Sequence, residues 1–73
     1  MWHYRPCKRK DKSGDYYFCV VEFFPKCVNG KDLWTRDAIK PVAYTRQELI
    51  KDLEMMLKDC KHYKTLDDTK EKI

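Results

Sequence analysis

An amphipathic helix near the C-terminus is the feature that most constrains what this chain can fold into. In residues 44–61, apolar side chains recur at the spacing of one face of a helix with about 3.6 residues per turn. These side chains are Leu49, Ile50, Leu53, Met56, Leu57 and Cys60. Thr45 followed by Glu48 has the pattern of a capping box, which predicts that the helix begins there. Such a stripe requires an apolar surface to pack against, and the preceding residues must supply it.

Two strands are predicted in the first third of the chain. Residues 2–7 send alternate side chains to opposite sides. Pro6 has no N–H for a ladder, so this strand is expected to lie at a sheet edge or to end there. Residues 16–24 are rich in aromatic and β-branched side chains and have the strongest strand pattern in the chain. The polar residues 8–14 between them are expected to form a hairpin loop.

A third strand and the helix complete the expected fold. Pro25 is expected to end the second strand, and the Asn29-Gly30 turn signal leads to a shorter strand over residues 31–36. Residues 37–43 then cross to the helix as an extended segment. The sequence therefore predicts an α+β fold of order β-β-β-α. In it, a three-stranded antiparallel meander carries one C-terminal amphipathic helix packed on one face.

Length and charge point to one small domain. The 73 residues have room for a single core, which we expect within residues 1–66, followed by a charged, frayed tail over residues 67–73. Sixteen Lys and Arg against twelve Asp and Glu give a net charge of +4, well below that of a dedicated nucleic-acid binder. No apolar run is long enough to span a membrane, and no signal-peptide pattern is present. We therefore expect a cytoplasmic protein, located in a host cell if it is phage-encoded.

The cysteines do not form a recognisable metal or redox motif. They are Cys7, Cys19, Cys27 and Cys60. No two are spaced as Cys-x-x-Cys, and without a secretory signal we expect all four to be reduced and metal-free. Two disulfides are one alternative. A zinc site built from Cys60 and His62 with Cys7 or His3 is another. We expect no cofactor.

No catalytic constellation is found in the sequence. Nucleophile motifs, phosphate-binding loops and paired catalytic carboxylates are absent from it. Glu22 is notable because it lies within an otherwise apolar strand. Since an unpaired buried carboxylate is costly, Glu22 is expected to face solvent or to form a structural ion pair with Arg5, Arg36 or a lysine. We assign no catalytic residue and do not expect an enzyme.

Residues 16–24 are apolar on both faces, and this feature suggests a function. One helix covers one face of a small sheet, so the other face would expose a contiguous apolar patch, which usually marks an interface. A β-bulge that shifts the register, or coverage by the tail, is the alternative. The partner-binding residues assigned to this patch are Trp2, Tyr17, Val21, Phe23 and Trp34. The patch predicts a non-enzymatic protein-interaction module that homodimerises through its sheet or docks on another protein.

Nucleic-acid binding through the basic first hairpin is a second hypothesis. Five cations gather there, namely Arg5, Lys8, Arg9, Lys10 and Lys12. Exposed aromatic side chains would serve as stacking platforms for bases. Because phosphate contacts release counterions, such binding is expected to weaken steeply as salt is raised.

Several motifs resemble small uncharacterised bacterial and phage proteins. The chain begins Met-Trp-His-Tyr-Arg, has Val-Glu-Phe in a tyrosine-rich strand, and carries Leu-Glu-Met-Met-Leu in its helix. This group implies no established activity, and it suggests a phage-borne or mobile-element regulator. The strand order, the Gly-Asp-Tyr-Tyr start of the second strand and the helix are also similar to the partial ribonuclease-H-like domain of HicB-type antitoxins. That resemblance implies an antitoxin role.

Overall fold

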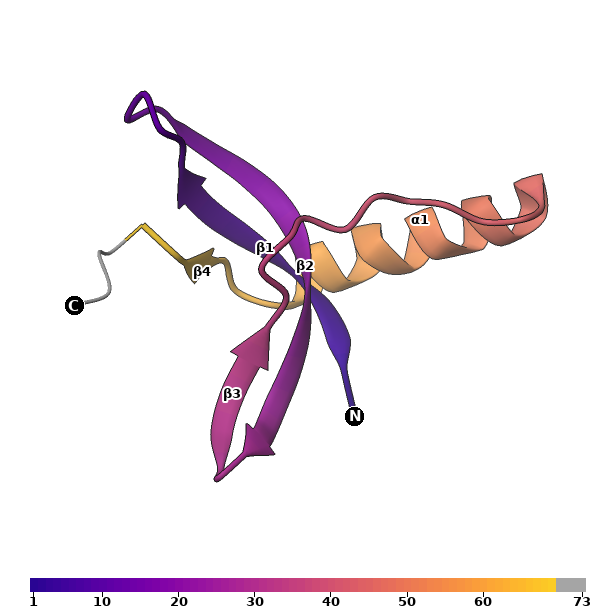
Figure 1. The fold of residues 1–73 in the computed structure, drawn as a ribbon. Helices are drawn as coiled ribbons and strands as arrows, with labels where there is room; N and C mark the ends of the chain where they lie inside the picture. The colour runs from indigo at the N-terminus through magenta and orange to yellow at the C-terminus, as the bar shows by residue number, and fades with distance from the viewer. Residues whose placement is uncertain (70–73) are drawn as a thin grey trace.

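The computed structural model describes residues 1–69, apart from the side chain of Val28. In chain order, the elements are β1 (His3–Lys10), β2 (Tyr16–Val28), β3 (Lys31–Trp34), α1 (Arg46–His62) and β4 (Leu66–Asp67). The strands form one curled sheet in the order β3-β2-β1-β4, with α1 beside it (Figure 1). β1 and β2 pair antiparallel, as do β2 and β3, whereas β4 runs parallel to β1. The fold is therefore α+β with one helix and a mixed sheet.

The fourth strand corrects the predicted three-stranded antiparallel meander. Leu66 and Asp67 of β4 pair with Cys7 and Lys8 of β1. A strand of two residues is too short to show an alternating pattern, so local sequence gives no signal for it. Its pairing follows from where α1 ends, because the helix delivers the chain to the outer edge of β1.

The first residues of the expected tail are bonded to the sheet. The Asp68 N–H donates to the Lys8 carbonyl oxygen at 2.9 Å. The Thr69 N–H donates to the Asp67 carboxylate at 3.1 Å. The rest of the expected tail, residues 70–73, lies outside the described residues.

β1 is an inner strand only where β4 pairs with Cys7 and Lys8, so at Pro6 it still lies at an edge of the described sheet, as expected. The Tyr4 N–H points away from β2, since it donates to the Asp59 carboxylate of α1 at 3.0 Å. Alternate N–H groups of a strand point the same way, so the nitrogen of Pro6 also faces this outer side. β4 starts pairing only at Cys7, so the missing N–H of Pro6 falls outside that ladder.

β2 continues past its predicted end at Pro25 and reaches Val28. The ladder between β2 and β3 shifts register between Phe24 and Val28, and this bulge takes Pro25 out of the pairing. Asn29 and Gly30 then form a tight turn, with φ of 50° and 73°. Positive φ at both turn residues matches the twist of the flanking strands, as the Asn-Gly signal predicts.

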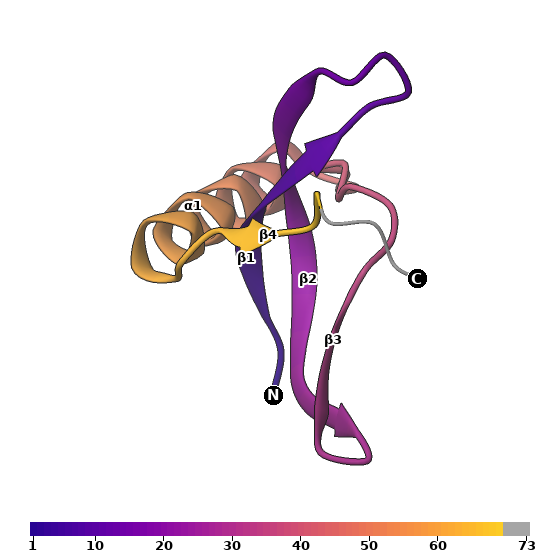
Figure 2. The same ribbon diagram turned by 90° about the vertical axis from the view of Figure 1, so that its left-hand side faces the viewer.

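α1 begins as predicted but packs differently. The Thr45 hydroxyl oxygen accepts a hydrogen bond from the Glu48 N–H at 3.1 Å, which caps the helix. The sequence predicts a helix across one face of the sheet, whereas α1 runs beside β1 and makes little contact with β2. Its N-terminal half extends beyond the sheet (Figure 1). The β1–β2 hairpin projects away from α1 in another direction (Figure 2).

The core is small and lies mainly on one face of the two central strands. Its buried apolar residues are Tyr4, Cys7, Val21, Phe23 and Met56. The register pairs Cys7 with Cys19 and places Val21 and Phe23 on the same face as that pair. Phe18, on the opposite face, is exposed. The two apolar faces of β2 are therefore unequal near its middle, where Val21 and Phe23 are buried and Phe18 is exposed.

Candidate interaction surface

α1 carries a row of exposed apolar side chains, which we term the helix stripe: Ile50, Leu53 and Leu57. Ile50 and Leu53 are each 44% exposed and Leu57 is 57% exposed, while Met56 is the buried residue of this helix. The exposure follows from how α1 is held. Asp59 ties its C-terminal half to Tyr4 of β1, whereas the N-terminal half extends past the sheet (Figure 1).

The chain has more surface than a compact domain of its mass. Its accessible surface is 6518 Å² and its mass is 8.9 kDa. A compact monomer of that mass exposes roughly 4,800 Å². Its radius of gyration is 13.5 Å, against about 11 Å expected for a compact chain of this length. The excess is more than about 1,000 Å² on this scaling, and the projecting helix and hairpin contribute to it (Figure 1, Figure 2).

The patch predicted on the sheet does not form as one surface. Val21 and Phe23 are buried in the core, which makes them unavailable as contact residues in this fold. Trp34 is half-buried and stacks on Phe23 with ring centroids 6.1 Å apart. Trp2 and Tyr17 are exposed, but the register puts Tyr17 on the face of Val21 and Trp2 on the other. The alternation of side chains could not reveal this correction, because both faces of residues 16–24 are apolar.

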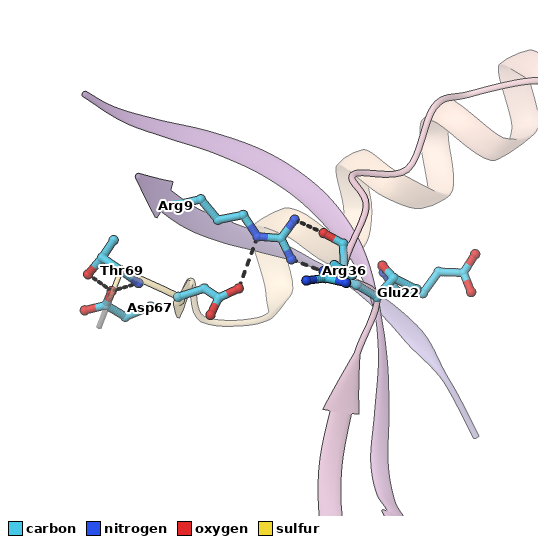
Figure 3. Close-up of polar contacts among 7 residues, drawn as sticks. Arg9, Glu22, Arg36, Asp67 and Thr69 are labelled. Carbon is cyan, nitrogen blue, oxygen red and sulfur yellow. Dashed lines mark hydrogen bonds and ion pairs between the residues drawn. The ribbon is translucent and has the colours of Figure 1, made fainter. Parts of the chain in front are cut away.

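Arg9 joins three segments of the chain (Figure 3). Its Nε donates to the Asp68 carboxylate at 3.2 Å, which ties β1 to the residues after β4. Its other nitrogens donate to the carbonyl oxygens of Thr35, at 2.8 Å, and of Arg36, the two residues that follow β3. The Arg9 side chain is 11% exposed. This guanidinium therefore serves the fold and is not available to grip a phosphate.

The other four cations of the first hairpin fall into two groups: Arg5 is engaged with the backbone, as Arg9 is, and the three lysines are not. Arg5 donates through two nitrogens to the Lys64 carbonyl oxygen, at 2.8 and 3.1 Å, and lies over the ring of Phe23. Lys8 and Lys10 instead lie near the exposed ring of Tyr16, and Lys12 is exposed in the loop. The structure therefore brings Lys8 and Lys10 together at the Tyr16 ring, and it directs the two arginines into contacts with backbone carbonyls.

His3 lies where β1 meets the end of α1. Its ring stacks on Tyr63 with centroids 3.6 Å apart and lies 5.2 Å from the ring of Phe23. Its Nε2 atom is buried and has no hydrogen-bond partner among the described residues. Burial lowers the pKa of His3 and outweighs the nearby Asp59 carboxylate, which raises it. The fold accommodates the neutral imidazole.

Acidification is expected to destabilise the protein through His3. The unfolded chain takes up a proton near the ordinary pKa of 6.5, whereas the folded state resists protonation. The free energy of unfolding therefore falls as pH drops from 6.5 toward the lower pKa of the folded state. His3→Phe keeps a stacked ring and removes the titration, so its urea midpoint should change less between about pH 7 and pH 5. Equal pH dependence in both proteins would contradict this role.

The thiols occupy very different environments. Cys7 is completely buried, Cys19 and Cys60 are half-buried, and Cys27 is exposed in the hairpin bulge. All four are free thiols in this fold. Burial raises the pKa of Cys7 and of Cys60, which makes their nucleophilic thiolate forms scarcer.

Glu22 is half-buried and lines an open hollow beside the crossing segment. The hollow has a volume of about 870 Å³ and is lined by Glu22 and residues 35–40. The Glu22 backbone forms two hydrogen bonds with Thr35. Its N–H donates to the Thr35 hydroxyl, and its carbonyl oxygen accepts from the Thr35 N–H. Its carboxylate forms no ion pair within the described part of the chain, where Arg9–Asp68 is the salt bridge. Of the two alternatives expected for Glu22, the ion pair is therefore not present among residues 1–69, and the carboxylate lies at the open hollow.

Other classes of site receive no structural support within residues 1–69. These residues contain no cluster of three or more His, Cys, Asp or Glu side chains arranged to hold a metal ion. No helix among them is long and apolar enough to cross a membrane. No protein-family model, no curated protein and no solved structure matches this chain.

Proposed function

We propose that this protein is a non-enzymatic interaction module that works as a homodimer, joined along the helix stripe. The exposure of Ile50, Leu53 and Leu57 carries the proposal, because their spacing is that of a helix face built for burial. Most of the stability of a short helix in a protein comes from packing its apolar face. A stripe left in water forgoes that stabilisation, so it requires a partner surface.

A second copy of the chain is the partner that the surface area favours. A standard protein interface takes about 800 Å² from each partner. The excess surface of the whole chain, to which the projecting half of α1 contributes, is larger than that (Figure 1). A two-fold axis beside α1 would place the stripes of the two copies against each other. Each stripe would then supply the apolar surface that the other lacks.

The test compares two substitutions on the same helix. Leu53→Glu puts a carboxylate in the middle of the helix stripe and is expected to weaken self-association at least about thirtyfold. Met55→Glu is the matched control, because Met55 is 47% exposed and lies two residues on, on the other side of the helix. Sedimentation velocity over a range of concentrations measures the association. Circular dichroism checks that both variants keep their helix.

Three results would overturn the proposal. One is a wild-type chain that stays monomeric at every concentration. Another is equal dissociation of Leu53→Glu and Met55→Glu, which would show that any added charge on α1 suffices. The third is a dimer that survives Leu53→Glu, which would move the contact away from α1, for example to the exposed Trp2 or Tyr17 of the sheet.

A further inference from the structure

A second surface lies at the projecting end of the β1–β2 hairpin (Figure 2). The register pairs Lys8 with Phe18 and Lys10 with Tyr16, so all four side chains lie on one face of the sheet. We term these four residues the hairpin face. Phe18 is 67% exposed and Tyr16 is 59% exposed. Aromatic side chains in a strand are normally packed against neighbouring side chains. These two rings are mostly exposed to solvent and lack that packing.

Two lysine ammonium groups lie over the Tyr16 ring of the hairpin face. The Lys8 ammonium lies 4.6 Å from the centroid of the Tyr16 ring, and the Lys10 ammonium lies 5.8 Å from it. Lys12 is exposed in the adjoining loop. Of the two carboxylates in this loop, Asp11 accepts hydrogen bonds from the N–H groups of Ser13 and Asp15, both at 2.9 Å. The face is therefore aromatic and positively charged, and it complements an anionic ligand with planar groups.

We propose that the hairpin face binds single-stranded nucleic acid, with Tyr16 and Phe18 stacking on bases and Lys8, Lys10 and Lys12 contacting phosphates. Residues two apart in a strand stand about 7 Å apart, which leaves room for one base on each ring. Stacking requires unpaired bases and tolerates any sequence, since every base has a flat face. The site differs from the whole basic hairpin, because the guanidiniums of Arg5 and Arg9 are engaged with backbone carbonyls elsewhere. It does not depend on the homodimer.

Fluorescence anisotropy with a labelled oligodeoxythymidine of about 15 nucleotides tests the site. The full chain is expected to bind this probe at low salt, and to bind duplex DNA of similar length more weakly. Affinity should fall steeply toward about 200 mM salt. Phe18→Ala should weaken binding about tenfold through lost stacking. Lys8→Ala should weaken it less and also reduce the salt dependence.

The matched controls lie outside the hairpin face. Leu33→Ala removes an exposed apolar side chain from β3, and Lys40→Ala removes an exposed cation from the crossing segment. Both should bind the probe as the wild type does. Circular dichroism of each variant confirms that its secondary structure is retained.

Several outcomes would overturn the proposal. The first is a lack of anisotropy change at low salt. The second is unchanged affinity in Phe18→Ala, which would reduce the interaction to general charge attraction. The third is equal binding of duplex and single strand. Vesicles rich in phosphatidylserine form a separate arm: retention on them without any binding of the oligonucleotide would assign the hairpin face to an anionic membrane surface instead.

Discussion

Replacing Phe23 with alanine is expected to lower the free energy of unfolding by about 3–5 kcal/mol. Phe23 is 5% exposed, and its ring lies between the stacked Trp34 ring, the His3 ring and the Arg5 guanidinium. Truncation removes all three contacts and leaves a cavity in a core of few residues. Because small domains are stabilised by only about 5–15 kcal/mol in total, the variant is expected to be largely unfolded at moderate temperature.

Phe18→Ala is the matched control on the same strand. Its side chain is mostly exposed, so the loss is expected to stay below about 0.5 kcal/mol. Urea unfolding followed by far-ultraviolet circular dichroism measures both variants, at one fixed protein concentration because the proposed dimerisation would add to the apparent stability. Equal losses at the two positions would mean that both faces of β2 are core, and that the burial of the Val21 face has no special importance.

The elements that the sequence predicts well are those with strong local patterns. The capping pattern at Thr45 and Glu48 marks the first turn of α1, because the bond it predicts lies within three residues. The aromatic and β-branched run marks β2, and Asn29-Gly30 marks its turn, because positive φ suits those residues. Each of these features is decided by neighbours in the chain.

Which face of β2 is buried is decided by contacts between segments that are distant in the chain. The local sequence pattern therefore cannot predict it. Both faces of residues 16–24 are apolar, so alternation alone cannot show which one is buried. The pattern therefore places Val21 and Phe23 in a contact patch, although the fold buries both. Their environment instead depends on how β1 pairs with β2 and on the stacking of the Phe23 ring against Trp34.

Two carboxylates with structural roles were also missed. Asp59 lies between Met56 and Cys60, on the side of α1 that faces β1, and a charge in that place was a usable signal for a backbone partner. Asp68 gave no such signal, because it follows Asp67 in a charged segment that reads as a solvated tail. Its contact with Arg9 is visible only once β4 has been placed.

Arg9→Ala is expected to lower the free energy of unfolding by about 2–3 kcal/mol, because hydrogen bonds to charged groups are worth about 1.5–3 kcal/mol. The substitution leaves three acceptors without their donor: the Asp68 carboxylate and the carbonyl oxygens of Thr35 and Arg36. It also has a local consequence. The Asp68 N–H, which donates to the Lys8 carbonyl, should exchange with solvent faster, since β4 loses its side-chain tie to β1.

Arg9→Lys separates charge from geometry. A lysine keeps the positive charge, but its single ammonium cannot reproduce the planar fork that reaches three acceptors on two segments, so it should recover less than half of the lost stability. Lys12→Ala, which removes an exposed cation from the neighbouring loop, should leave both the urea midpoint and the Asp68 exchange rate near wild type. If Arg9→Ala shifts the urea midpoint no more than Lys12→Ala does, the surrounding packing holds the three segments together and Arg9 adds no measurable stability. If Arg9→Lys matches the wild type, charge alone explains the contact, and the fork geometry contributes nothing.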